Sequence, residues 1–329
     1  MQTHDYTGLE LSTTILIKAA IKRAIDVEIL DREDNFIRLK KGNKIEYIKQ
    51  ATKTSVDPYI VPLIMENKEV TKLILRENDI NVPAGIKIKT VAEALENCHQ
   101  FQGKDIVVKP NSTNFGMGIV ILKEMQCEKN YRSALETAFK HDSAVLIEEF
   151  IFGKEYRFLI IGDQVAAILH RVPANVIGDG VRSIAELVAE KNKNPLRGSG
   201  YVTPLEKLKL KQPEIDYLKD QKKTIDTVPN KGETVYLREN SNISTGGDSI
   251  DFTDDIRDEY KQIAVLAAKA VGAKICGVDM IITDIHHQPN TSNYGIIELN
   301  FNPALHIHNY PYQGENRHVE EKVLDLLGF

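Results

Sequence analysis

The sequence predicts a mixed α+β (α/β) protein made of about three domains or subdomains. Segments whose apolar residues recur at helical spacing alternate with short runs of valine and isoleucine, which are typical of strands. The length of 329 residues exceeds that of one typical domain and suffices for a sizeable core. A content of 42% hydrophobic and 27% charged residues is ordinary for a globular protein.

The first predicted piece covers residues 1–65. Isoleucines recur at every fourth position from Ile17 to Ile25, which predicts a helix over 12–25. A short strand over 27–30 and a β-hairpin over 36–48 are expected to follow.

The second predicted piece, residues 66–151, alternates helices with strands. Its helices are expected at 66–78, 90–100 and 130–140, and its strands at 106–108, 116–122 and 145–151. Residues 111–118 are then the loop that connects the first two strands.

The third predicted piece covers residues 152–329. A long hairpin over 155–171 is expected to turn at Gly162 and Asp163, and strands are expected at 276–282 and 296–300. Helices are expected at 184–191, 255–271 and 319–327, while residues 172–240 otherwise carry few structural signals.

Composition excludes several classes of protein. The net charge of −5 argues against a nucleic-acid binder, which usually carries a basic patch. The three cysteines (Cys98, Cys127 and Cys276) are odd in number and far apart, which argues against a disulfide framework and fits a reducing cytoplasm. The N-terminal sequence does not read as a signal peptide, and no stretch approaches the ~18 apolar residues that span a membrane. We therefore expect a cytoplasmic protein that binds neither nucleic acid nor membrane.

The common nucleotide and hydrolase motifs are absent from the sequence. It contains no GxxxxGK[ST], no GxGxxG, no GxSxG and no HExxH. Any nucleotide must therefore be bound by another device.

Three residues near the C-terminus suit a divalent cation. Asp279 lies in one apolar strand, and Glu298 and Asn300 lie two positions apart, and so on one face, in the next. A buried acid is costly unless it is paired or metal-bound, and oxygen ligands suit Mg²⁺. The alternative is a solvated sheet face on which Glu298 forms an ion pair.

A lysine followed by a glycine-containing loop suits a phosphate. Lys109 ends a strand, and the loop 111–118 that follows contains Ser112, Gly116 and Gly118. A lysine ammonium and backbone N–H groups in such a loop can bind phosphate oxygens. Alone the pattern is weak, because a glycine-containing loop is more often only a turn.

Two further segments carry polar groups beside strands or glycines. Residues 147–157 place acids at the end of an apolar strand, where they can accept hydrogen bonds from an adenine and a ribose. Residues 238–248 combine an arginine, hydroxyls and glycines, which suits an anion site. Each segment can equally be an ordinary surface loop.

The order of these segments over about 70–305 resembles the ATP-grasp superfamily. Further segments are similar to the glutathione-synthetase module of bifunctional bacterial glutamate–cysteine ligase/glutathione synthetases, over almost the whole chain. The sequence contains no counterpart to that family's N-terminal glutamate–cysteine ligase module. The segments that carry this similarity are 52–55, 63–68, 112–116, 174–180 and 240–251.

The resemblance implies an ATP-grasp fold, in which two α+β subdomains enclose ATP after a small N-terminal subdomain. It assigns Lys72, with Lys68 as the alternative, and Lys109 to the ATP phosphates, beneath the loop 111–118. It further implies that Glu148, the backbone of Glu149 and Ile151, Glu155 and Ile297 surround the adenosine. Asp279, Glu298 and Asn300 would hold about two Mg²⁺ (or Mn²⁺) ions.

One position departs from the superfamily pattern. Many related ligases carry an arginine two residues before the metal-binding aspartate, and this sequence has Gly277 there. We therefore assign the γ-phosphate and acyl phosphate to Arg238, and the substrate carboxylate to Arg171 or Arg157.

The implied function is ATP-dependent ligation of γ-glutamylcysteine and glycine through an acyl phosphate. The alternatives are a cyanophycin-synthetase-like or other ATP-grasp amino-acid ligase, and a non-catalytic ATP-binding module. As partners, the resemblance leaves open a homodimer and a glutamate–cysteine ligase module.

Overall fold

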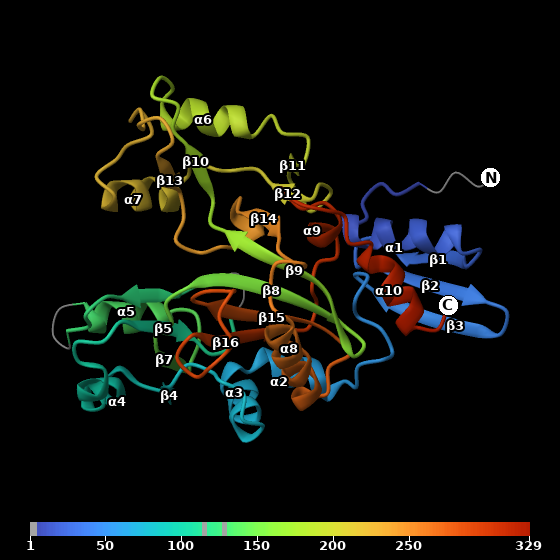
Figure 1. Ribbon diagram of the computed structural model, residues 1–329, viewed down its shortest axis with the longest axis horizontal. Coiled ribbons are helices and arrows are strands. Elements are labelled where there is room, and N and C mark those ends of the chain that lie inside the picture. The colour runs from blue at the N-terminus through green and yellow to red at the C-terminus, as the bar shows by residue number, and fades with distance from the viewer. Residues whose placement is uncertain (1–4, 114–116, 127–129) are drawn as a thin grey trace. The chain divides into compact units, whose positions relative to one another are not determined.

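The computed structural model describes residues 5–113, 117–126 and 130–329 (Figure 1). By their internal contacts the residues form two units, each assembled from separate stretches of the chain. The first unit holds 1–56, 164–254 and 302–329, and the second holds 57–163 and 255–301. The domain boundaries predicted after residues 65 and 151 divide the chain into three continuous pieces, whereas each unit here combines separate stretches. These boundaries stay a prediction.

The first and the last helix of the chain lie together in the first unit. The antiparallel sheet β1-β2-β3 is joined there by the helices α1 and α10, which contact each other. The helix predicted over 12–25 ends at Lys22, and Ala24 just beyond it has a left-handed φ of 55°. The bounds are α1 Leu11–Lys22, β1 Asp26–Asp31, β2 Phe36–Lys41, β3 Lys44–Lys49 and α10 Val319–Leu326.

The rest of the first unit consists of short paired strands and helices. β9 pairs with β14 and β10 with β13, both antiparallel, and β11 pairs with β12 in parallel. The predicted helix over 184–191 is confirmed as α6, and a capping box between Ser183 and Glu186 fixes its start. The bounds are β9 Gln164–Val172, β10 Asn175–Ile177, α6 Ile184–Lys191, β11 Arg197–Gly198, β12 Leu205–Glu206, α7 Gln212–Asp220, β13 Thr234–Tyr236, β14 Asp248–Asp251 and α9 His306–Asn309.

One half of the second unit is the antiparallel sheet β4-β7-β5-β6. The helices α4 and α5 contribute to its core, whose members include Tyr131, Leu135, Ile106 and Ile147. The strand predicted over 116–122 begins only at Val120, and Gly118 before it has a φ of 73°. The bounds are β4 Gly85–Ile88, α4 Val91–Glu96, β5 Ile106–Pro110, β6 Val120–Leu122, α5 Tyr131–Phe139 and β7 Val145–Glu149.

The other half of the second unit places β15 between β8 and β16, with both pairings antiparallel. The helices α2, α3 and α8 pack on these strands and on one another. The helix predicted over 66–78 is observed as α3 and begins two residues later, because Asn67 has extended dihedrals and its side chain caps α3 at the N–H of Val70. The helix α2, which ends at Glu66, was not predicted. The bounds are α2 Ile60–Glu66, α3 Lys68–Glu77, β8 Lys154–Ile161, α8 Asp258–Val271, β15 Ile275–Ile282 and β16 Tyr294–Asn300.

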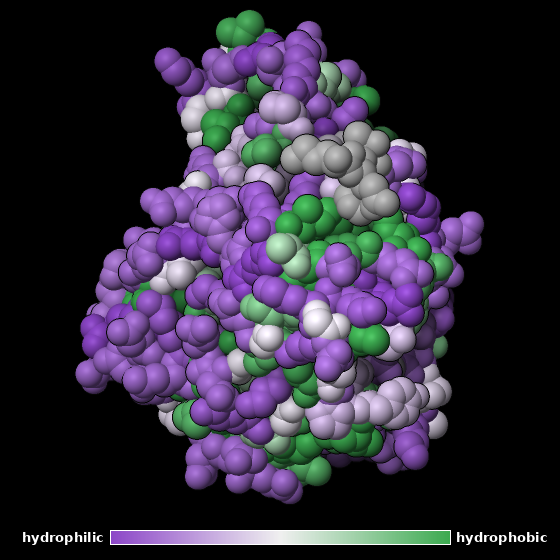
Figure 2. All heavy atoms as spheres, turned by 90° about the vertical axis from the view of Figure 1, so that its right-hand side faces the viewer, coloured by the Kyte–Doolittle hydropathy of each residue, from purple (hydrophilic) through white to green (hydrophobic). Residues whose placement is uncertain are grey.

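Two expectations from composition can be compared with the structure. The sequence argued against a disulfide framework, but Cys98 is disulfide-bonded, so this expectation is wrong for that residue. Cys276 is a free, buried thiol. Among the described residues, no helix is long and apolar enough to cross a membrane. Figure 2 shows a face on which hydrophilic residues predominate, with hydrophobic ones scattered among them.

Candidate active site

The three predicted cation ligands lie together on adjacent strands. The register of β15 and β16 places Asp279 opposite Glu298, and Gly277 opposite Asn300. The side-chain amide of Asn300 donates a hydrogen bond to Oδ2 of Asp279 at 3.2 Å. The side chain of Asp279 is 1% exposed and that of Glu298 is 26% exposed. The pair therefore has one buried carboxylate and one that solvent reaches.

Arg157 is the direct partner of the buried carboxylate. It lies on β8, opposite Asp279 in the register with β15. Its guanidinium donates two hydrogen bonds to the two oxygens of Asp279, of which the one from Nη2 measures 2.6 Å. Burial opposes the charge of Arg157, but Asp279 outweighs burial and raises the pKa of this arginine. The two hydrogen bonds therefore fix the orientation of the Asp279 carboxylate.

A second buried cluster centres on Glu148, at the end of β7. Its carboxylate forms ion pairs with Lys72 of α3 and, at 2.8 Å, with Lys109 of β5. Burial would raise the pKa of Glu148, but the two lysines outweigh burial and lower it. Burial alone would lower the pKa of Lys109, but the negative charge of Glu148 has the larger effect and raises it. Burial and the neighbouring Lys109 lower the pKa of Lys72 to about 7.

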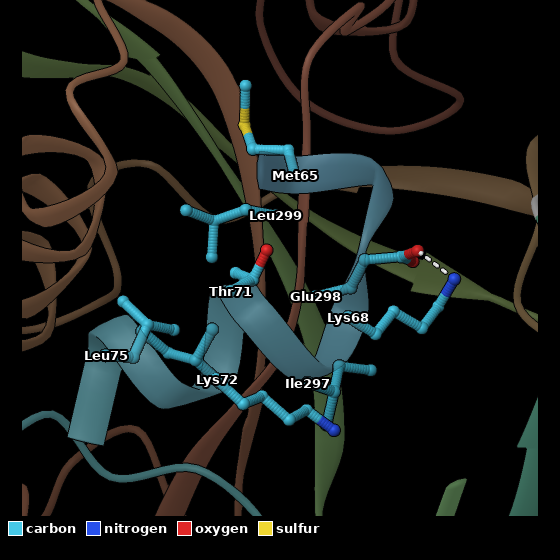
Figure 3. A pocket seen from close by; sticks show the side chains of 9 residues that line it. Met65, Lys68, Thr71, Lys72, Leu75, Ile297, Glu298 and Leu299 are labelled. Carbon is cyan, nitrogen blue, oxygen red and sulfur yellow. Dashed lines mark ion pairs between the residues drawn. The ribbon is translucent and has the colours of Figure 1, made fainter. Parts of the chain in front are cut away.

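Lys68 connects the acidic pair to the loop that follows β5. Its Nζ lies 3.2 Å from Oε1 of Glu298 and donates a hydrogen bond of 2.6 Å to the carbonyl of Thr113. The dashed line in Figure 3 marks the ion pair between Lys68 and Glu298. Asn111, at the start of the loop, accepts a hydrogen bond from the N–H of Glu69 at 3.2 Å. The first turn of α3 thus holds the beginning of the loop.

A small pocket lies between α3 and β16 (Figure 3). The space between its lining side chains is about 210 Å³, part of it open to solvent. The pocket is lined by Met65, Lys68, Thr71, Lys72, Leu75, Ile296, Ile297, Glu298 and Leu299.

The other residues assigned to the adenosine also lie in the second unit. Each of them contacts a different part of that unit. The backbone N–H of Glu149 donates to the carbonyl of Ala84 at 2.9 Å, and its side chain pairs with Lys104 at 2.7 Å. Ile151 lies against Gly295, where a Cβ would meet its Cδ1. Glu155 lies on β8 opposite Ile281, and Ile297 lines the pocket.

Two of the three loop residues assigned to phosphate can be described. The N–H of Ser112 donates to Oδ2 of Asp142 at 2.7 Å. Gly118 has a positive φ, and a Cβ there would lie 2.7 Å from the ring of His141, so the position requires glycine. Gly116 lies outside the described residues.

The two predicted catalytic arginines belong to the first unit. Arg238 forms a salt bridge of 2.6 Å with Glu214 of α7. Arg171 is buried on β9, opposite Ser249 of β14. The arginine that contacts the acidic pair within the second unit is instead Arg157, which the sequence suggested only for a substrate carboxylate. The sequence does contain a sign of this role. Arg157 lies two residues after Glu155, so both side chains are expected on the same face of one strand.

The arrangement suits a polyphosphate and a divalent cation. Four cationic side chains (Lys68, Lys72, Lys109 and Arg157) surround three carboxylates (Glu148, Asp279 and Glu298). No group of three or more His, Cys, Asp and Glu that could hold a metal occurs in the described part of the chain. Mg²⁺ needs only one or two carboxylates, with water and phosphate completing its shell, so the pair Asp279 and Glu298 with Asn300 fits it.

Comparisons with known proteins show which proteins the chain is similar to. Residues 7–60 match the family described as ATP-grasp-like domain, 74–179 the D-ala D-ala ligase C-terminus, and 223–316 the RimK-like ATP-grasp domain. The chain is 59% identical over 322 residues to the glutathione biosynthesis bifunctional protein GshAB of Clostridium perfringens, covering 98% of this chain and 41% of that protein. It is 53% identical over 326 residues to the protein of the same name from Desulfotalea psychrophila, covering 99% and 42%.

A solved structure extends the similarity to the fold. The crystal structure of a bifunctional glutathione synthetase from Pasteurella multocida has a TM-score of 0.76 and 47% identity, over 98% of this chain and 44% of that one. The chain spans less than half the length of these relatives. The predicted α+β ATP-grasp fold is confirmed, and matches to ATP-grasp domain families occur in both the N-terminal and the C-terminal part of the chain.

Proposed function

We propose that the chain is an ATP-dependent carboxylate–amine ligase that joins γ-glutamylcysteine to glycine and forms glutathione. The observation that carries the proposal is the cluster of lysines and Arg157 around the acidic pair Asp279 and Glu298. Phosphoryl transfer depends mainly on positioning and charge neutralisation, which such a cluster supplies. The names of the relatives support the choice of substrates.

The reaction has two steps. An oxygen of the cysteinyl carboxylate attacks the γ-phosphorus of ATP, the bond from that phosphorus to the β,γ-bridging oxygen breaks, and ADP leaves. The glycine amine then attacks the carbonyl carbon of the acyl phosphate and loses a proton, and phosphate leaves with one oxygen of the original carboxylate.

The chain's own groups have distinct roles in this scheme. Lys109, Lys72 and Lys68 bind phosphate oxygens, and the loop 111–118 excludes water from above them. Asp279, Glu298 and Asn300 hold about two Mg²⁺ or Mn²⁺ ions, which when bound neutralise charge on the phosphates. Arg171 binds the dipeptide and Arg238 the transferred phosphoryl group. Glu148, Glu149, Ile151, Glu155 and Ile297 surround the adenosine. A cytoplasmic location, a homodimer and a glutamate–cysteine ligase module as partner stay predictions.

The test of this proposal is ADP release from a panel of dipeptide and amine pairs. We expect γ-glutamylcysteine with glycine to release ADP faster than any other pair, and alanine to be a poorer acceptor, because added atoms overlap a cramped site. Release with other amino acids but not with γ-glutamylcysteine would replace the proposal by a related ligase. Nucleotide binding without ADP release from any pair would favour a non-catalytic module.

Lys72 gives this site a characteristic proton exchange. Its pKa is lowered to about 7, so at pH 8 the free protein holds it largely neutral. Phosphate oxygens favour the charged amine and raise its pKa, so we expect binding of a non-hydrolysable ATP analogue at pH 8 to take up a proton. At pH 6 the lysine already carries that proton, and the uptake disappears.

Calorimetry in two buffers of different ionisation enthalpy measures this uptake. The variant Lys72→Met should bind the analogue more weakly, without the uptake at pH 8. An uptake that persisted in this variant would assign the proton to another group.

A further inference from the structure

Arg157 and Asp279 form a pair that occupies the centre of the acidic site. The pair is bidentate, joins two adjacent strands, and leaves only 12% of the arginine side chain and 1% of the aspartate side chain exposed. Such fork-to-carboxylate pairs are among the stronger ones in proteins, because two parallel hydrogen bonds fix both partners. The carboxylate assigned to the cation is thus already neutralised by a residue of the chain.

Gly277 provides the room for this arginine. It lies two residues before Asp279 on β15, and so on the same face of the strand. A Cβ at Gly277 would lie 2.9 Å from Cδ and 3.3 Å from Nε of Arg157. Its φ is not in the left-handed region, so the backbone does not require glycine. The position is glycine because the arginine side chain fills the space above it.

The pairing has a consequence for cation binding. A positive charge bound to Asp279 weakens the attraction of that carboxylate for a second cation. Glu298, the other acid, has Lys68 at 3.2 Å. In the nucleotide-free protein the acidic site therefore presents little uncompensated negative charge. The phosphates of a nucleotide offer the guanidinium another partner of matching geometry.

We propose that Arg157 is a positioning residue that couples nucleotide binding to divalent-cation binding. Its guanidinium neutralises Asp279 in the nucleotide-free protein and transfers to phosphate oxygens when a nucleotide binds, which leaves the aspartate to the cation. Gly277 keeps the space in which the guanidinium reaches both positions. This inference rests on the proposed nucleotide site, and it requires neither glutathione nor any acceptor.

Two binding measurements without turnover test this exchange. The first is Mn²⁺ affinity of the nucleotide-free protein, followed by electron paramagnetic resonance. The second is affinity for a non-hydrolysable ATP analogue in the presence of a chelator. For Arg157→Gln we expect Mn²⁺ to bind at least about tenfold more tightly, since a neighbouring positive charge is gone. The same variant should bind the metal-free analogue more weakly by a similar factor.

The opposite signs separate the proposal from a purely structural role, which would weaken both affinities. Gly277→Ala keeps the arginine but displaces it from Asp279, so it should also tighten Mn²⁺ binding. The double variant Arg157→Gln with Gly277→Ala should differ in Mn²⁺ affinity from Arg157→Gln alone by less than about twofold. The alanine then displaces a neutral glutamine rather than a charged arginine. The exposed Arg132→Gln on α5 controls for the lost charge and should leave both affinities unchanged.

Weaker or unchanged Mn²⁺ binding in Arg157→Gln would overturn the proposal, as would metal-free analogue binding at wild-type strength. If Arg157→Gln does not fold, unchanged Mn²⁺ affinity in Gly277→Ala overturns it equally. These results do not depend on which substrates release ADP. If no pair of dipeptide and amine released ADP, the proposed function would be refuted. The coupling between nucleotide binding and cation binding could still be measured.

Discussion

Asp279→Asn is expected to lower kcat for ADP release by a factor on the order of 10²–10³, the cost of removing one electrostatic group from a transition state. Asp279 is buried, contacts both Arg157 and Asn300, and lies opposite Glu298. The substitution removes a negative charge that would hold the cation but keeps an oxygen that accepts from the guanidinium. Because Arg157 then loses its ionised partner, the variant should be less stable than the wild type but still folded.

Steady-state kinetics at saturating Mg²⁺, with circular dichroism as the check on folding, measures this effect. The matched control is Asp258→Asn on α8, whose partner in the wild-type protein is Lys261 and whose side chain is 83% exposed. It removes the same charge from the same unit and should leave kcat unchanged. Wild-type turnover in Asp279→Asn would show that the acidic pair does not hold the catalytic cation.

Glu148→Gln is expected to destabilise the protein by ~3–5 kcal/mol, the cost of removing one partner from a buried ion pair. The carboxylate lies between Lys72 and Lys109 and is 4% exposed. Without it, two buried amines face each other with no neutralising charge. Urea denaturation at pH 7 measures the loss.

The adjacent residue supplies the control for this variant. Glu149 pairs with Lys104, but both side chains are about half exposed, at 43% and 51%. Glu149→Gln should cost only ~0–1 kcal/mol, because solvent screens the pair. Equal losses of stability in Glu148→Gln and Glu149→Gln would show that the carboxylate of Glu148 does not stabilise the buried cluster.

The pH dependence of the Glu148 effect has a definite sign. Lys109 and Lys72 outweigh burial and lower the pKa of Glu148, so the folded state holds fewer protons than the unfolded state near the ordinary pKa of glutamate. The stability that this group contributes is therefore present above that ordinary pKa and is lost as the pH falls through the folded value. The difference in free energy of unfolding between the wild type and Glu148→Gln should therefore shrink as the pH falls.

The acidic site could be predicted from sequence because it depends on local patterns. Asp279 lies in an apolar run, and the spacing of Glu298 and Asn300 places both on one face of the next strand. Consecutive strands usually neighbour each other, which is what brings these residues together. The ATP-grasp fold followed from the order of such segments.

Other features depend on contacts that no local pattern reveals. Arg157 reaches Asp279 only through the register of β8 with β15, strands separated by more than a hundred residues. The choice between Lys68 and Lys72 depends on how Asn67 divides two helices, since both lysines face the site from α3. The disulfide of Cys98 likewise depends on the tertiary fold.

We expect the carboxylate of γ-glutamylcysteine to become an acyl phosphate at this site. The direct measurement uses γ-glutamylcysteine labelled with ¹⁸O in its cysteinyl carboxylate, together with ATP, Mg²⁺ and glycine. Phosphorus magnetic resonance of the products then shows where the label goes. We expect one ¹⁸O in each phosphate released and none in ADP, whereas phosphate without label would contradict an acyl phosphate intermediate.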